Sequence, residues 1–132
     1  MSYLLDTHAF LWAVFSTEKL GRRARITIAD ASSAVCLSSL TIWEISLKFS
    51  LGKLILKNTT PENLVDVAHS MGLSMISPSA EESASFHHLP RVAHRDPFDR
   101  MLVWQAIQRQ LVLISKGAAL PSYRDARLKT LW

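Results

Sequence analysis

The feature that most constrains this chain is a repeated alternation between short apolar runs and longer segments with helical spacing. The clearest runs, residues 34–37 and 111–114, are four residues long and partly β-branched, as buried parallel strands are. Between such runs, apolar residues recur three and four positions apart, which is the spacing of one helix face. Strands that alternate with helices predict a parallel sheet covered by helices on both faces. We therefore expect an α/β fold, a three-layer α/β/α sandwich with a central, mostly parallel sheet.

Turn and cap residues divide the chain into these elements. Thr60 and Asp96 each precede a proline, as an N-cap before the first helical turn does, and Gly52 and Gly72 are typical helix stops. Strands are expected at 3–5, 34–37, 73–76, 111–114 and 128–132, and helices at 8–15, 22–32, 39–51, 61–71, 78–86, 97–109 and 118–123. Because 132 residues without a linker or internal repeat fit one core, residues 1–132 are expected to form a single domain.

Composition excludes several classes of protein. With 48% apolar and 20% charged residues, the chain resembles an ordinary packed globule and not a disordered segment. No apolar stretch reaches the roughly 18 residues of a membrane span, and Asp6 and His8 do not fit a signal peptide. Cys36 alone forms no internal disulfide. We expect a cytoplasmic protein without a membrane partner, and its net charge of +4 favours a polyanion such as RNA.

Acidic residues fall where the strands are expected to end. Asp6 directly follows the first strand, Glu44 lies on the helix after the second, and Asp96 and Asp99 begin the helix before the fourth. In an open parallel sheet, ligands bind beyond the carboxyl ends of the strands. Carboxylates that converge there repel one another unless a cation neutralises them. Mg²⁺ or Mn²⁺, held by carboxylates and water, activates water for attack on a phosphodiester.

Each of these acids also has an ordinary structural interpretation. Asp96 and Asp99 have the spacing of a capping box, and Glu44 fits a surface acid that the helix dipole favours in a first turn. Asp6 is harder to explain without a function, because an acid after an apolar strand is costly to bury unpaired. Thr7 fits either a helix cap or a group that holds a metal-bound water. The histidines form no compact zinc pattern.

Three blocks, taken together, carry a resemblance. They are Leu4 to His8, Ser39 to Ser46 around Trp43-Glu44-Ile45, and His94 to Leu102 around Asp96-Pro97-Phe98-Asp99. In this order and at these separations the chain resembles a PIN-domain ribonuclease toxin of the VapC type, and the similarity continues through Leu113-Ile114-Ser115 to the final Leu131-Trp132.

That resemblance implies a toxin of a type II toxin–antitoxin system, a metal-dependent endoribonuclease that cuts RNA such as tRNA or rRNA. It also implies inhibition by a cognate antitoxin, a homodimer and a larger toxin–antitoxin complex. Asp6, Glu44 and Asp99 match the family's catalytic acids, and Asp96 joins these three as a metal ligand.

The chain departs from the family pattern at Gly117. In such proteins an acid usually stands two residues after the position of Ser115, whereas here Ser115-Lys116 is followed by Gly117. A missing fourth acid predicts weak metal binding and little turnover, so a catalytically weakened relative that still binds antitoxin or RNA is the main alternative. A turn glycine with positive φ would need no function at all.

Two other classes of α/β protein fit less well. A phosphoacceptor receiver domain needs a second acid beside Asp6 and an acceptor Asp after a middle strand, where this chain has Thr7 and Ser38-Ser39. A haloacid-dehalogenase-type phosphatase needs Asp two residues after the first, where this chain has His8.

Overall fold

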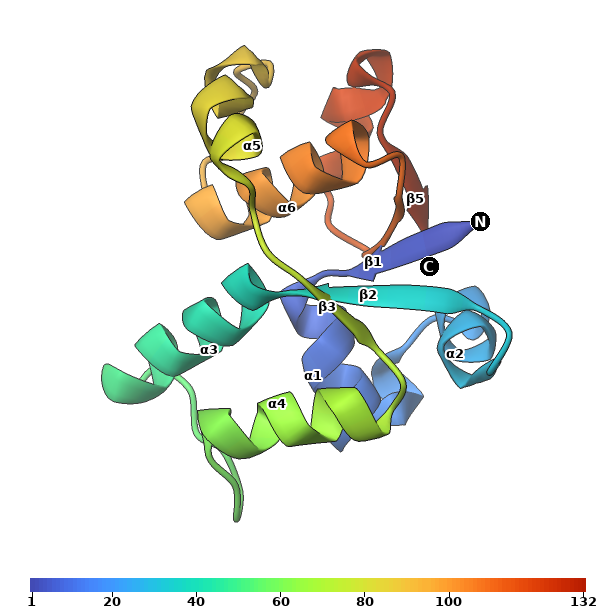
Figure 1. The fold of residues 1–132 in the computed structure, drawn as a ribbon, viewed down its shortest axis with the longest axis vertical. Helices are drawn as coiled ribbons and strands as arrows, with labels where there is room; N and C mark the ends of the chain where they lie inside the picture. Colours follow the sequence, from blue (N-terminus) through green and yellow to red (C-terminus); the bar gives the residue numbers. More distant parts are fainter.

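The computed structural model describes residues 1–132 and has a five-stranded parallel sheet at its centre (Figure 1). Its strands are β1 (Ser2–Leu5), β2 (Ala34–Ser38), β3 (Ser74–Ile76), β4 (Val112–Ile114) and β5 (Lys129–Leu131). The order across the sheet is β3-β2-β1-β4-β5. All five strands lie where the apolar runs predict them, and the expected α/β class is confirmed.

The helices also follow the cap and stop residues. They are α1 (Thr7–Phe15), α2 (Arg22–Ala29), α3 (Ser39–Ser50), α4 (Pro61–Ser70), α5 (Ala80–Ser85) and α6 (Pro97–Gln108), with 3₁₀ turns η1 (Thr17–Lys19), η2 (Phe86–His88) and η3 (Leu120–Ala126). The short helix expected at 118–123 is the 3₁₀ turn η3, which begins and ends a few residues later. None of the helices combines the length and the apolar character that a membrane crossing requires.

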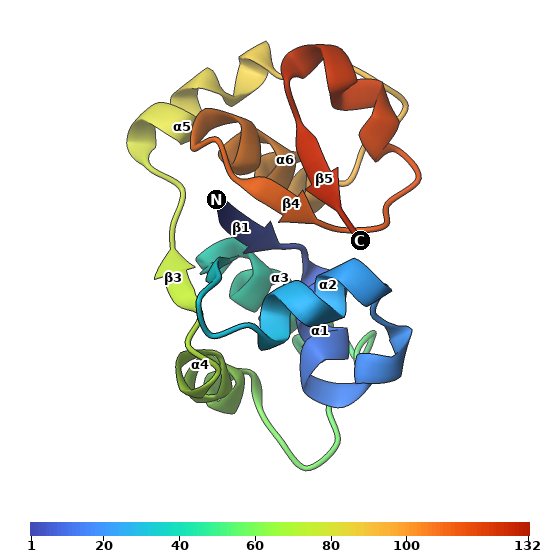
Figure 2. The same cartoon turned by 90° about the vertical axis from the view of Figure 1, so that its right-hand side faces the viewer.

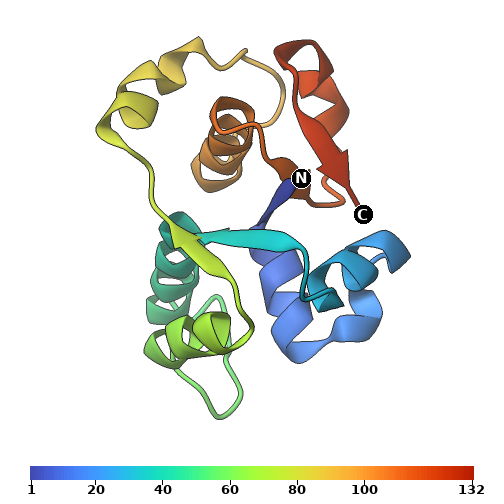
Figure 3. The ribbon, with the colours of Figure 1, turned by 45° about the vertical axis from the view of Figure 1, so that its right-hand side comes forward.

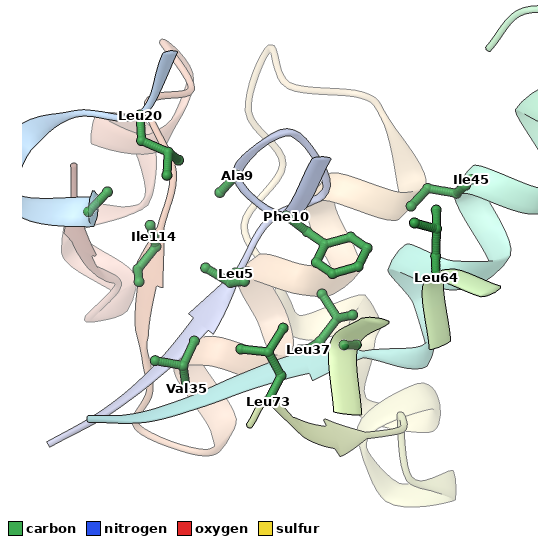
Figure 4. Packing of buried hydrophobic residues seen from close by; sticks show 12 residues of the cluster. Leu5, Ala9, Phe10, Leu20, Val35, Leu37, Ile45, Leu64, Leu73 and Ile114 are labelled. Atoms are coloured by element: carbon green, nitrogen blue, oxygen red, sulfur yellow. The ribbon is translucent and has the colours of Figure 1, made fainter. Parts of the chain in front are cut away.

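Side chains of the strands alternate between two hydrophobic cores, one on each face of the sheet. Leu5 and Ile114 point to the first core with α1 to α4, whereas Leu4 and Leu113 point to the second, with α6 and η3. This alternation follows from the two-residue period of a strand. Figure 2 shows the two helical layers on opposite sides of the strands, and Figure 4 shows Phe10, Leu37 and neighbouring side chains filling the first core.

The order of the strands defines where a ligand site is expected. From β1 the chain first moves outward through β2 and β3, and its helices α1 to α4 lie on one face. It then crosses through α5 to the opposite face (Figure 3) and returns to place β4 on the other side of β1. The connections therefore change direction between β1 and β4. Crevices at such a switch point, beyond the carboxyl ends of the strands, are where α/β proteins bind ligands.

Candidate active site

Asp6 lies at this switch point, directly after β1. Its backbone N–H donates to the carbonyl of Ile114 at the end of β4, at 3.2 Å. The side chain is the N-cap of α1, because Oδ1 accepts a 2.7 Å hydrogen bond from the backbone N–H of Ala9. Asp6 therefore has both a structural role and the position of a ligand-binding acid.

Asp99 comes to the same region from α6. Asp96 is the N-cap of this helix and accepts from the N–H groups of Phe98 (2.9 Å) and Asp99 (3.1 Å). The reciprocal bond of a capping box is absent, so the Asp99 carboxylate does not serve the cap. It lies 3.5 Å from Nε2 of His94, whose Nδ1 lies 3.1 Å from the Tyr123 hydroxyl.

Asp6 and Asp99 face one cavity of about 510 Å³. Its wall also carries two histidines, two tryptophans, the segment after β4 and several apolar side chains. The lining residues are Asp6, His8, Trp12, His94, Asp99, Leu102, Val103, Leu113, Ser115, Lys116, Gly117, Ala118, Ala119, Leu120 and Trp132. Two of the four predicted acids thus share this cavity, and Glu44 and Asp96 are not in its lining.

Glu44 lies in the second turn of α3 and is 2% exposed, so the interpretation as a surface acid in a first turn is wrong. Its Oε1 accepts a 2.7 Å hydrogen bond from Thr7, and its Oε2 pairs with Lys48 at 2.5 Å. Thr7 also lies 3.2 Å from the hydroxyl of Thr41. Thr7 is therefore not the cap of α1, since Asp6 has that role, but a donor that fixes Glu44.

Lys48 is a site residue that the sequence analysis missed. Its hydrogen bond with Glu44, and the charges of Glu44, Asp96 and Asp99, raise the pKa of the Lys48 ammonium against the opposing effect of its burial. The spacing of four residues between Glu44 and Lys48 was the available signal, because side chains at i and i+4 meet on a helix.

The acids influence one another across the site. Burial raises the pKa of Asp6, and Glu44 adds to this rise, while hydrogen bonds from Ser115 and the Ala9 N–H oppose it. Burial also raises the pKa of Asp99, together with the charges of Asp96 and Glu44. Both shifts favour the protonated acid, so a cation that lowers the repulsion would favour the charged form.

The acids of the site have the chemistry that a divalent metal requires but not its geometry. Carboxylate oxygens are the ligands that Mg²⁺ and Mn²⁺ prefer, and the raised pKa values of Asp6 and Asp99 reflect buried negative charge that lacks full compensation. In this conformation, however, no group of three or more His, Cys, Asp or Glu side chains is arranged to hold a metal ion. The carboxylates of Asp6 and Asp99 are suitable ligands for a cation. Both carboxylate oxygens of Glu44, by contrast, are already engaged, one by Thr7 and the other by Lys48.

We expect the stability of the metal-free protein to fall where Asp6 and Asp99 ionise. Each carboxyl has a folded pKa above its ordinary value of 3.8, so between the two values the native state binds more protons than the unfolded state. The free energy of unfolding therefore decreases as pH rises through this interval. The free energies of unfolding of the wild type and of Asp6→Asn, measured by urea titration in EDTA, should differ least at low pH, where Asp6 is protonated. As pH rises, the two values should diverge, because the wild type loses more stability than the variant. Equal pH dependence in the two proteins would contradict the prediction.

Gly117 lies at the rim of the cavity, where its N–H donates to Oγ of Ser115 at 3.1 Å. Its φ is not in the left-handed region, which among the glycines is adopted by Gly52 and Gly72 alone. The interpretation of Gly117 as a turn residue with positive φ is therefore wrong. A Cβ placed there would meet nothing closer than 3.5 Å, from Leu120 and Ser115. Neither the backbone nor the packing requires glycine at this position.

Solved structures with a similar fold include a chain of VapBC2 from Rickettsia felis, which was crystallised bound to a DNA fragment from its own promoter. Its TM-score is 0.69 at 15% identity, over 99% of this chain and 98% of that chain. FitAcB from Neisseria gonorrhoeae has a TM-score of 0.64 at 16% identity, over 98% and 96%. VapBC-1 from nontypeable Haemophilus influenzae has a TM-score of 0.61 at 14% identity, over 99% of this chain and 97% of that chain.

Among curated proteins, comparison of sequences finds no match. The family model of the PIN domain, by contrast, matches residues 3–125, a range that includes all four predicted acids and, apart from Ser2 at the start of β1, every strand except β5. Because this match spans nearly the whole chain, the protein belongs to the PIN domain family.

Proposed function

We propose that this protein is the toxin of a type II toxin–antitoxin system and acts as an Mg²⁺- or Mn²⁺-dependent endoribonuclease. The observation that carries the proposal is the placement of Asp6 and Asp99 in one cavity at the switch point of the sheet. PIN domains are generally nucleases, and the formal charge of +4 favours a polyanionic substrate. The proposed substrate is RNA, of the tRNA or rRNA class.

In this proposal Asp6, Glu44 and Asp99 are the catalytic acids, and Asp96 joins them as a metal ligand. A divalent ion would supply Lewis-acid activation of the phosphodiester and of the attacking water. Asp6 is held by the Ala9 N–H, and Asp99 is carried by the first turn of α6 with its carboxylate 3.5 Å from Nε2 of His94. Glu44 becomes available as Lys48 leaves its Oε2.

A protein partner is supported by the outer surface of α3 and the residues that follow it. Trp43, Leu47 and Leu51 follow one another at four-residue intervals, on one side of α3 and at its C-cap, and are 60%, 38% and 58% exposed. Exposed apolar residues grouped on one face mark interaction sites. The structural relatives are toxin–antitoxin complexes, one solved with promoter DNA. We propose a cognate antitoxin, a homodimer and a larger assembly of the two proteins as partners, in the cytoplasm.

The second candidate function is a catalytically weakened PIN protein that binds antitoxin or RNA. Gly117 favours it, because this position contributes no carboxylate to the rim of the cavity. A missing ligand loosens the position of a metal, and catalysis of phosphoryl transfer depends mostly on position and charge.

Incubation of a labelled structured RNA with the protein in Mg²⁺, Mn²⁺ or EDTA tests both functions. A nuclease is expected to yield fragments with either metal, none in EDTA and none with Asp6→Asn, whereas the exposed Asp66→Asn should cleave like the wild type. Binding without cleavage would favour the weakened form. RNA affinity should fall as salt rises, because Lys and Arg contacts release counterions. Salt-independent binding, or no binding, would contradict RNA as the substrate.

A further inference from the structure

The cavity that contains Asp6 and Asp99 has an aromatic and basic wall that the proposed catalytic acids do not explain. Trp12 comes from α1, and its ring lies 5.7 Å from that of Trp132 in an edge-on arrangement. His8 packs beside Trp12 at 5.6 Å. Gly21 contacts Trp132 so closely that a Cβ there would lie 2.5 Å from the indole ring. The packing thus holds Trp132 in place at the cavity.

Lys116 lies over this aromatic pair. Its Nζ is 4.7 Å from the ring centre of Trp12 and 6.0 Å from that of Trp132. No carboxylate forms a salt bridge with Lys116 or with Arg124, since the three salt bridges of the protein involve other cations. Lys116 is exposed, and its ammonium contacts the faces of the two rings instead of a carboxylate.

A second cavity of about 220 Å³ adjoins the first. The two share Ser115, Lys116, Gly117 and Leu120, and the second adds Arg124 and Thr130 to its lining. Two cations without a salt bridge thus line the same pair of cavities as the aromatic rings and the two acids. Grooves that bind single-stranded nucleic acid combine basic residues for the phosphates with aromatic rings for the bases.

We propose that these two cavities form a nucleotide subsite, in which one unpaired base stacks on the face of Trp12 and packs against Trp132, while its phosphate binds Lys116 and Arg124. The proposal rests on the proposed nuclease function and adds that the RNA enters as a single strand with at least one base turned out of its stack. Lys116 leaves the Trp12 face when the base arrives, and its ammonium turns to the phosphate.

A base on the Trp12 ring is expected to contribute more to affinity than the Lys116 contact that it replaces. An exposed cation–π contact contributes a factor of roughly 2 to 5 in affinity, whereas a base stacked on an aromatic side chain contributes a factor of roughly 5 to 160. Replacement of the lysine by a base therefore gains affinity at the ring, and the displaced ammonium gains a charge-assisted hydrogen bond to phosphate.

The four indole N–H signals in an NMR spectrum of the ¹⁵N-labelled protein provide the test. Titration with adenosine 5′-monophosphate in EDTA is expected to shift the signals of Trp12 and Trp132. The signal of Trp104, whose Nε1 donates to the Glu82 carbonyl, and that of the exposed Trp43 should stay in place. Each signal is assigned by a Trp→Phe variant. Ribose 5-phosphate, which lacks the base, should bind at least about fivefold more weakly.

Two variants separate the base from the phosphate. Lys116→Met should weaken adenosine 5′-monophosphate and ribose 5-phosphate alike, and Trp12→Leu should remove the preference for the nucleotide; if Trp12→Leu does not fold, Trp12→Phe should reduce it. The exposed Lys53→Met serves as the control for Lys116→Met. Equal affinity for the two compounds, or shifts at Trp43 instead of Trp12 and Trp132, would overturn the proposal. Because EDTA excludes metal chemistry, these results do not depend on whether the protein cleaves RNA.

Discussion

Gly117→Asp is expected to raise Mg²⁺ affinity and RNA cleavage together, by about a hundredfold in rate. The new carboxylate would stand at the rim of the cavity that contains Asp6 and Asp99. A side chain can start at this position without a clash, because the added Cβ meets Leu120 and Ser115 only at ordinary contact distance. Calorimetric titration with Mg²⁺ and cleavage of a labelled RNA measure the two effects separately. The variant should also be toxic when expressed without an antitoxin.

Matched variants show whether charge is responsible. Gly117→Asn has nearly the same shape without the charge and should gain little, while Asp6→Asn in the Gly117→Asp protein should remove the gain. If the Gly117 protein already cleaves RNA at a rate that Gly117→Asp does not improve, a fourth acid is dispensable and the proposed reason for weak activity is wrong.

Lys48→Met is expected to lower the free energy of unfolding of the metal-free protein by about 2 to 3 kcal/mol. Glu44 is 2% exposed, and removing its cation leaves a buried carboxylate with the Thr7 hydroxyl as its side-chain donor, which is among the costlier single changes in a protein. Lys48 itself is 40% exposed, so water reduces the effect. Urea titration in EDTA measures it.

The same variant tests the link to the metal. Mg²⁺ should restore more stability to Lys48→Met than to the wild type, because Oε2 of Glu44 is then free for the ion. The double variant Glu44→Gln/Lys48→Met should regain most of the lost stability without metal, since no buried charge remains. A Lys48→Met protein as stable as the wild type would show that Lys48 does not compensate Glu44.

The sequence predicted where the helices and strands lie along the chain better than it predicted which of them pack together in space. Asp6 could be placed at a strand end because the apolar run stops there, and the strand order then brought it beside β4. The sequence did not determine that order, since each crossover can pass to either side of β1. It also did not show that Glu44 is buried against Lys48 and Thr7, because this depends on how α1 packs on α3. Likewise, the separation of Asp96 from the cavity depends on the orientation of one helix turn.

The central place of β1 has a consequence for the synthesis of this protein. β1 is synthesised more than a hundred residues before β4, which is one of its two partner strands. Until Val112 to Ile114 are made, Asp6 lacks the Ile114 carbonyl that binds its backbone, and the walls formed by residues 115–120 and Trp132 do not exist. Contacts so distant in sequence form late in folding. A chain that stops before β4 therefore has no assembled site, and the proposed nuclease activity is expected only after residues 112–132 have been added.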